Sequence, residues 1–542
     1  MLSLLNITIG ILWFLSATID YAGLCYVWQL KWYRLDKFKD FISTEQGKRF
    51  IYRYDILWRT LMALFIFFWP INSVLLLKEI IIAFFIIDLS YGFYRVLKHK
   101  ARRPVPTPKA LLIIFLSMVL EASWIILTRD WAILLLALIM HFFIIGIVVY
   151  IVHKFTWVVK QILIIKAKHK LVGYPNLIVI GITGSYGKTT VKEFLSQILS
   201  AKFKVIKTPK YLNSHIGILK FILKTDFNNT DIFVAEVAAD KKGDITLICD
   251  VIKPKIGILT AINEQHLSIF GSIKNTQSTK YELLRSLPKD GLAVVNSDNK
   301  YCCEYLQELD TTVKTFGTEE KYKPNYLIDD VHNTKEGIEC HGSYLHDKQV
   351  IKSVIRPKVH GEYQAMNIAP CIIVGSFLGM KDEEIISAAN KLKNLEQGLQ
   401  IYNYGKTTII DDSHNSNPDG FKVALQVLNS RSSGKRRIVV TRGMMELADE
   451  SDELHEIIAG EIAFVADELV IITPDFIEPL RAGAMSDKYH LEIKIKTNPE
   501  KLLEYIKSLK NKDFVILLEN RLPLLVYNEI SKEKINTKGC IL

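Results

Sequence analysis

The chain has 542 residues, which is more than a single domain holds, and 49% of them are hydrophobic. Its formal net charge is +11, and the excess lies in residues 1–170, which contain 21 Lys and Arg against 9 Asp and Glu. A basic total often indicates a nucleic-acid partner. Here the basic residues flank hydrophobic segments, so an anionic membrane surface explains them better, and we expect no nucleic-acid partner.

The seven cysteines form no CxxC pair and no cysteine–histidine cluster at zinc spacing. This pattern argues against a zinc site. It fits a reducing cytosol around the part of the chain that follows the hydrophobic segments.

Apolar stretches in the first 170 residues have the length and composition of membrane-spanning helices. They cover approximately residues 4–29, 57–75, 79–97, 110–128 and 131–152. The first is not a cleavable signal peptide, because it lacks a basic start and a small-residue cleavage site. The long connections between the stretches are basic, which places them in the cytoplasm and the N-terminus outside. We therefore predict about five membrane spans, with the later domains in the cytoplasm.

Ionisable residues lie within or near the ends of these apolar stretches: Asp20, Asp88, Glu121 and His141. Intramembrane ionisable groups are functional candidates by default. Interhelical hydrogen bonding and snorkelling at the ends of spans explain them equally simply. Both interpretations stay open at this point.

A glycine-rich stretch, Gly181-Ile-Thr-Gly-Ser-Tyr-Gly-Lys-Thr-Thr190, stands between an apolar β-prone run and a helical pattern. A strand, a glycine loop and a helix N-terminus together direct backbone N–H groups at a phosphate. The spacing is shorter than the common form, because Ile182 occupies the position of its first glycine. We predict a nucleotide-phosphate loop, with Lys188 on the terminal phosphates and Thr189 on Mg²⁺. Its residues are Gly184, Ser185, Tyr186, Gly187, Lys188, Thr189 and Thr190.

Alternating strand and helix patterns over residues 171–395 predict a mostly parallel α/β sheet. Glu236 ends one predicted strand, where a carboxylate beside a phosphate loop is placed to hold Mg²⁺. Residues 313–356 resemble a β insertion, and residues 361–379 a helix. A second α/β unit covers residues 396–542. We therefore expect a membrane region over 1–170, a central P-loop domain over 171–395 and a Rossmann-like C-terminal domain over 396–542.

In sequence order, a set of short motifs resembles the Mur ligase family of ATP-dependent enzymes, and most of all its D-alanyl-D-alanine-adding members. After the phosphate loop, the matching motifs are Leu212-Asn-Ser-His-Ile-Gly217, Ala235-Glu-Val237, Gln265-His-Leu-Ser-Ile-Phe-Gly-Ser272, Lys280-Tyr-Glu-Leu283, Asn296-Ser-Asp-Asn299, His360 with Asn367, Asp411-Asp-Ser-His-Asn-Ser-Asn-Pro418, and Met445-Glu-Leu447 with His455. The resemblance covers about residues 171–542. It is specific as a set, because the motifs fall in the family's order.

The resemblance implies an amide ligase of peptidoglycan-precursor synthesis. ATP phosphorylates a carboxylate of the acceptor, and the amine of an amino acid or dipeptide attacks the acyl phosphate. By position, Lys188, His266 and Lys280 would be catalytic, and Lys280 would be carbamylated. Two Mg²⁺ ions would be held by Thr189, Glu236, His266 and Lys280. The nucleotide would also contact Asn296, Asn367 and Asp412, with Asp298 nearby.

The chain departs from the family's pattern at several places. Hydrophobic spans replace the domain that binds UDP, Leu399 replaces a linker arginine, Arg442-Gly-Met-Met445 lacks an acidic residue, and Leu518-Glu-Asn-Arg-Leu-Pro523 replaces a Lys-Gly-Ser-Arg stretch. The acceptor and the amine therefore stay open, as does whether the spans bind a lipid-linked acceptor or partner cell-wall enzymes. Two alternatives are a poly-γ-glutamate or capsule-type ligase and a membrane transport or signalling P-loop NTPase.

Overall fold

The computed structural model divides the chain into two compact units, Met1–Ile162 and Leu163–Leu542. It describes residues 2–538 apart from 44–53, 69–73, 98–102, 129–131, 210–211, 240, 264–271, 335, 347–348, 395–398, 414–417, 433, 445–450 and 486–489.

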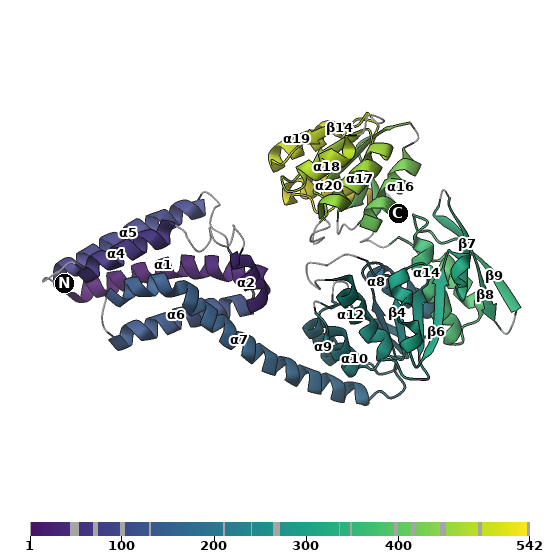
Figure 1. Ribbon diagram of the computed structural model, residues 1–542, viewed down its shortest axis with the longest axis horizontal. Coiled ribbons are helices and arrows are strands. Elements are labelled where there is room, and N and C mark those ends of the chain that lie inside the picture. The colour runs from purple at the N-terminus through teal and green to yellow at the C-terminus, as the bar shows by residue number, and fades with distance from the viewer. Residues whose placement is uncertain are drawn as a thin grey trace. The chain divides into compact units, whose positions relative to one another are not determined.

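The first unit is helical (Figure 1). Its helices are α1 (Leu2–Leu30), α2 (Leu35–Ser43), α4 (Tyr54–Phe68), α5 (Val74–Leu97), α6 (Pro108–Thr128) and α7 (Ala132–Val172). Among the described residues, three helical segments are long and apolar enough to cross a membrane: Leu4–Leu30, Leu75–Leu97 and Ala137–Val172. The described α4 has 15 residues, fewer than the roughly 20 that a span needs. The number of five spans therefore stays a prediction.

Helix α7 runs much further than the predicted span over 131–152, because its apolar residues continue without a Gly or Pro break into the basic segment 154–170. Its last turns belong to the second unit. Ile164 and Ala167 are buried there against Val179 and Phe233 of the adjacent sheet. The Lys170 ammonium donates to the carbonyls of Leu223 (2.9 Å) and Thr225 (2.6 Å), at the end of another helix.

The second unit begins with a nine-stranded sheet in the order β2-β3-β1-β4-β5-β6-β7-β8-β9. Its strands are β1 (Ile178–Thr183), β2 (Val205–Lys207), β3 (Ile232–Glu236), β4 (Ile256–Leu259), β5 (Leu292–Asn296), β6 (Thr312–Gly317), β7 (Tyr326–Asn333), β8 (Ile338–His346) and β9 (Gln349–Ile355). All neighbours up to β7 are parallel, which confirms the predicted fold class. The predicted β insertion extends this sheet: β6 and β7 join it in parallel, and β8 and β9 follow antiparallel.

Successive side chains along each strand point to opposite faces of the sheet. Both faces are apolar, and helices cover both of them. On β1, Ile180 and Ile182 pack against α8 (Lys188–Leu199), α14 (Gln364–Phe377) and α15 (Asp382–Asn390). Val179 packs on the other face with α9 (His215–Lys224) and α10 (Asp244–Ile252). Helix α12 (Ile273–Arg285) covers β4 and β5 on that side, and the short α13 (Lys300–Cys303) follows β5. The helix predicted at 361–379 is α14.

A six-stranded sheet follows, in the order β10-β11-β15-β12-β13-β14. Its strands are β10 (Gln400–Tyr404), β11 (Thr407–Asp412), β12 (Arg436–Thr441), β13 (Glu468–Ile471), β14 (Glu492–Ile495) and β15 (Phe514–Glu519). Only the β10–β11 pair is antiparallel among these strands. Its helices are α16 (Pro418–Arg431), α17 (Ser451–Val465), α18 (Ile477–Ala484), α19 (Pro499–Leu509) and α20 (Leu524–Lys538). This is the second α/β unit that the sequence predicts.

Candidate active site

The predicted phosphate loop joins the end of β1 to the start of α8. Gly184 has a φ of +151° and Gly187 a φ of +79°, in the region that favours glycine. A Cβ on Gly184 would lie 1.9 Å from the Thr260 hydroxyl, and one on Gly187 would lie 2.8 Å from the side-chain oxygen of Asn367. Both glycines are therefore required by the backbone conformation and by the space. The loop ends at the N-terminus of α8, whose free N–H groups suit an anion.

Neighbouring strand ends support the loop. The backbone N–H of Ser185 donates to Ala261 (2.7 Å), and the Ser185 hydroxyl accepts from the N–H of Asn263 (3.1 Å). The Thr260 hydroxyl donates to the carbonyl of Tyr186. Since the carboxyl ends of parallel strands meet at one edge, β4 holds the loop that follows β1.

The Lys188 ammonium donates back to the loop carbonyls of Gly184 (2.7 Å) and Ser185 (3.1 Å). Desolvation lowers the pKa of Lys188, and the Glu236 carboxylate partly opposes this effect. The lysine is thus folded over the loop that its backbone belongs to. Thr190, in the first turn of α8, is half-buried.

Thr189 and Glu236 lie together, as the sequence predicted. The Thr189 hydroxyl is 3.1 and 3.0 Å from the two carboxylate oxygens of Glu236. Glu236 ends β3, which pairs with β1, so its carboxylate reaches the first turn of α8. Lys192, one turn further along α8, is fully buried, and its Nζ lies 3.1 Å from the Glu236 carboxylate. A hydroxyl and a carboxylate oxygen are ligands that suit Mg²⁺.

Lys280 lies on α12, with only 9% of its surface exposed. Burial, followed by the charge of the nearby Lys188, lowers the pKa of Lys280 well below its usual range. The structure therefore brings Lys280 into electrostatic contact with the phosphate-loop lysine, although the two are 92 residues apart in the chain.

Asn296 and Asn367 also lie around the loop. Asn296 ends β5 and donates to the carbonyl of Thr260 (3.0 Å). Asn367, on α14, faces Gly187 and donates to the side chain of Gln364 (3.0 Å). Asp298, by contrast, accepts from the backbone and hydroxyl of Thr318, so its visible contacts are those of a turn.

His266 lies outside the described residues, so its predicted place at a second metal is untested. Among the described residues, no group of three or more His, Cys, Asp or Glu is arranged to hold a metal ion. In the Thr189 and Glu236 pair, only Glu236 belongs to these four residue types. A site with a single carboxylate fits Mg²⁺, which usually keeps several waters and binds substrate phosphates.

Asp412 lies in the second sheet, at the end of β11. Burial, followed by the charge of Asp411, raises the pKa of Asp412 to about 7. Beside it, Glu519 ends β15 in register with Asp412 and is fully buried. His455 supports the neighbouring turn: its ring accepts from the backbone N–H of Met444 (2.8 Å) and stacks on Phe476.

Lys192 and Thr260 are the site residues that the sequence reasoning did not single out. Lys192 stands on α8 among positions that are otherwise buried, and a lysine on a buried helix face is a detectable signal. Thr260 follows a predicted strand and carries no such signal, because a threonine after a strand is common.

The glycine loop, the parallel sheet and the Thr189–Glu236–Lys192 group define a phosphate-binding α/β protein. The model of the Mur ligase middle domain matches residues 182–375, and that of the Mur ligase glutamate ligase domain matches residues 399–518. The chain belongs to the Mur ligase family.

Curated relatives include the UDP-N-acetylmuramoyl-tripeptide–D-alanyl-D-alanine ligase of Bacillus subtilis, 28% identical over 284 residues, which are 51% of this chain and 58% of that protein. The ligase of the same name from Borreliella burgdorferi is 27% identical over 354 residues, 63% of this chain and 72% of the other. The chain spans about three fifths of the length of several such relatives.

Solved structures show the same fold. MurF from Acinetobacter baumannii superposes with a TM-score of 0.61 at 21% identity, over 70% of this chain and 80% of that one. MurF from Thermotoga maritima, in complex with ADP, gives a TM-score of 0.58 at 24% identity, over 70% and 84%. The fold of residues outside the helical unit is thus that of MurF.

Proposed function

We propose that the chain is an ATP-dependent, ADP-forming ligase that makes an amide bond in peptidoglycan-precursor synthesis, most like D-alanyl-D-alanine addition. The observation that carries the proposal is the group formed by Lys188, Thr189, Glu236 and Lys280 around one glycine loop, within the fold of a Mur ligase. Relatives whose names state this activity align with 51% to 63% of this chain.

The residues present fit ATP with Mg²⁺. Gly184 and Gly187 have positive φ angles, and a glycine loop of this kind would offer its backbone N–H groups to the phosphates. The Thr189 hydroxyl and Glu236 carboxylate would hold Mg²⁺, with Lys280 and His266 as the proposed ligands at a second ion. Bound Mg²⁺ supplies charge neutralisation between a phosphate and an acceptor carboxylate. Asn296, Asn367 and Asp412 would contribute to nucleotide binding.

The lowered pKa of Lys280 supports its proposed carbamylation, because only a neutral amine reacts with carbon dioxide. The product is an anion next to Lys188. In that form the negative charge of the Lys280 side chain would compensate the positive charge of Lys188, and the side chain would face the metal. An unmodified ammonium at Lys280 would instead repel Lys188.

The order of chemical events follows from the charges. The acceptor carboxylate attacks the γ-phosphate, which gives an acyl phosphate and ADP. The amine then attacks the acyl carbon, and phosphate leaves as the amide forms. Lys188 stabilises the phosphate oxygens in the first step. The second α/β unit would carry the amine, and its closure would keep water from the acyl phosphate.

We further propose that the helical unit crosses the bacterial cytoplasmic membrane about five times, with the N-terminus outside and the ligase domains in the cytoplasm. The apolar helices and the basic connections support this orientation. The acceptor would then meet the ligase near the membrane, either as a UDP-linked precursor or on a lipid, and other cell-wall enzymes would be possible partners.

Mass spectrometry of products tests the function. Full-length protein in nanodiscs is mixed with ATP, candidate precursors and a panel of amines. We expect a new amide whose formation matches ADP release. In Lys188→Ala both should fall by more than tenfold, whereas Lys220→Ala, on exposed α9 surface, should leave them unchanged. ADP release without any amide would instead indicate the NTPase alternative, and γ-linked glutamate polymers the capsule-type ligase.

A further inference from the structure

Ionisable side chains from five helices meet inside the helical unit. They are Asp20 on α1, Arg59 on α4, Asp88 on α5, Glu121 on α6 and His141 on α7, and each is less than a tenth exposed. None of them takes part in the site described above. Burial of charged groups among apolar helices has a large desolvation cost. The hydrogen-bond partners of these groups therefore indicate which of them are protonated.

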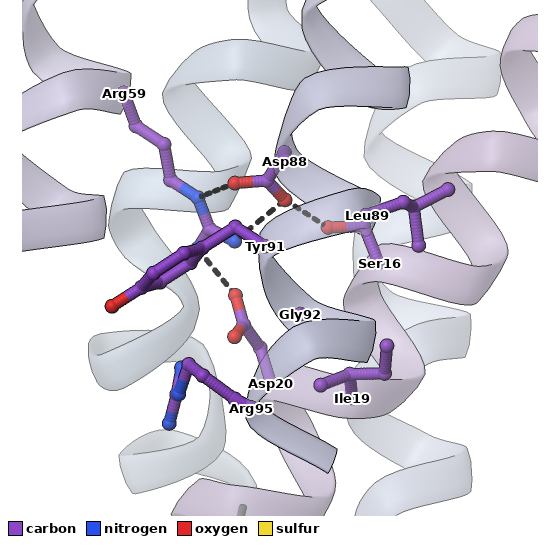
Figure 2. A pocket seen from close by; sticks show the side chains of 9 residues that line it. All are labelled: Ser16, Ile19, Asp20, Arg59, Asp88, Leu89, Tyr91, Gly92 and Arg95. Carbon is purple, nitrogen blue, oxygen red and sulfur yellow. Dashed lines mark hydrogen bonds and ion pairs between the residues drawn. The ribbon is translucent and has the colours of Figure 1, made fainter. Parts of the chain in front are cut away.

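Arg59 neutralises one end of this group. Its guanidinium donates to both oxygens of Asp88, from Nε (3.0 Å) and Nη2 (2.9 Å), and from Nη1 to Asp20 (Figure 2). The Ser16 hydroxyl donates to Asp88 as well (2.6 Å). Arg95 lines the same small cavity as Asp20 and Asp88. This end therefore resembles an ordinary buried ion network.

His141 occupies the other end, between two carboxylates. Its Nδ1 lies 3.3 Å from an oxygen of Asp20, and its Nε2 lies 3.0 Å from an oxygen of Glu121. A neutral imidazole has one N–H donor and one acceptor nitrogen, whereas an ionised carboxylate only accepts. One of these two contacts would then place a bare nitrogen against a carboxylate oxygen. The array is satisfied only when it holds one additional proton.

The other contacts of the carboxylates place that proton on the ring. Glu121 accepts from the Trp13 indole (2.7 Å) and the Tyr21 hydroxyl (2.8 Å), so donors already meet both of its oxygens. The Asp20 oxygen that faces His141 also accepts from Arg59. Carboxylates surrounded by donors stay ionised. With two N–H groups, His141 donates to both.

Charge counting points in the same direction. Asp20, Asp88 and Glu121 bring three negative charges, and Arg59 brings one positive charge. A charged His141 lowers the net charge of the five buried groups from −2 to −1, which a low-dielectric interior favours.

We propose that the Asp20–His141–Glu121 array is a proton-binding site inside the helical unit, with the proton carried by the His141 ring. The bound proton joins α1, α6 and α7, because the doubly protonated ring donates one N–H to Asp20 and the other to Glu121. Its release breaks one hydrogen bond and leaves two carboxylates facing each other across a neutral ring. Packing of these helices is thereby tied to the occupancy of the site.

Nitrogen-15 NMR of histidine-labelled full-length protein in nanodiscs tests this proposal, since the ring shifts report the protonation of each nitrogen. Near neutral pH we expect one buried ring with both nitrogens protonated. Its signal should vanish in His141→Gln and persist in His153→Gln, an exposed histidine on the same helix. Tyr21→Phe, whose ring lies 4.5 Å from His141, should shift the signal without removing it.

Asp20→Asn provides the sharper comparison. Its amide donates to Nδ1, so His141 needs only one N–H, and we expect a singly protonated ring in this variant. Two results would overturn the proposal. One is a wild-type protein in which no buried histidine ring is doubly protonated near neutral pH, a result that depends on no variant. The other is a ring that stays doubly protonated in folded Asp20→Asn.

Discussion

Lys192 carries a charge at a fully buried position where the carboxylates of Glu236 (3.1 Å) and Glu193 (3.8 Å) are its ion-pair partners. Removal of one member of a buried ion pair leaves the other charge uncompensated. The lysine therefore holds the Glu236 carboxylate in place beside Thr189 when no metal is bound.

We expect Lys192→Met to lower the free energy of unfolding by about 3–5 kcal/mol, the usual cost of breaking a buried pair. Differential scanning calorimetry of the purified protein measures the change in stability. Lys220→Met is the control, because Lys220 is an exposed lysine. Added Mg²⁺ should restore part of the loss, because a cation at Glu236 replaces the missing charge. An unchanged melting temperature would show that Lys192 does not support the carboxylate.

Asp412 makes stability depend on pH. Its pKa is raised to about 7 by burial and by Asp411, so the folded protein holds a proton that the unfolded chain releases near pH 4. More protons bound in the folded state means that stability falls as pH rises. We expect this contribution to be complete below about pH 4 and lost progressively up to about pH 7.

Melting temperatures across that pH range, for wild type and Asp412→Asn, check the expectation. The substitution should flatten the decline, because an amide does not titrate. A decline of equal slope in both proteins would place the titrating group elsewhere.

Much of the phosphate site was predictable at the level of single residues. Thr189 and Glu236 were found because a glycine loop and a strand-ending carboxylate are local patterns, and the parallel order of β3 and β1 brings them together. Lys192 was missed because the same helix face also fits a simple amphipathic pattern. The place of Asp298 near the nucleotide stays a prediction; local sequence did not reveal that its carboxylate accepts hydrogen bonds from Thr318.

At the level of elements, α7 shows that hydropathy indicates a membrane span but does not locate the end of a helix. Hydropathy places the end of the span near residue 152, whereas the helix continues to Val172. A helix continues as long as nothing breaks its backbone bonds, so a change from apolar to basic side chains does not end it. The strands of the predicted insertion show a different limit. Local patterns predict short strands there, but they do not show that β6 pairs with β5 and so continues the parallel sheet.

The orientation of the helices has a direct test. We expect a cysteine at Thr128, the end of α6, to react with a membrane-impermeant thiol reagent on intact cells. A cysteine at Leu35, the start of α2, should react only after the cells are opened, because the basic connections lie on the cytoplasmic side. Mass shifts of the purified protein measure the labelling. The reverse pattern would place the phosphate loop outside, away from ATP.

At the level of the whole molecule, the boundary between the units lies inside a continuous helix. Ile164 and Ala167 fill one face of the nine-stranded sheet, and Lys170 binds two carbonyls at the end of α9. The last turns of α7 therefore add buried contacts to the ligase domains, and a fragment that starts at Gly173 lacks them.

We expect a fragment that starts at Leu163 to be more stable than one that starts at Gly173, by several degrees in melting temperature, because the shorter fragment exposes Val179 and Phe233. Equal stability of the two fragments would contradict the packing role of α7.

Comparison of the Leu163 fragment with the full-length protein tests the acceptor. Equal rates of amide formation with a UDP-linked precursor would exclude a required lipid-linked acceptor, whereas a large loss of rate in the fragment would support one.

The burial of Ile164 and Ala167 also decides where this chain could be recombined. A different N-terminal segment joined before Leu163 would leave the apolar face of the sheet covered, because the last turns of α7 stay with it. A junction at Gly173 would instead remove core side chains, and the new segment would have to supply replacements. The exchangeable boundary of the ligase part therefore lies inside the helix and not at the start of its first strand.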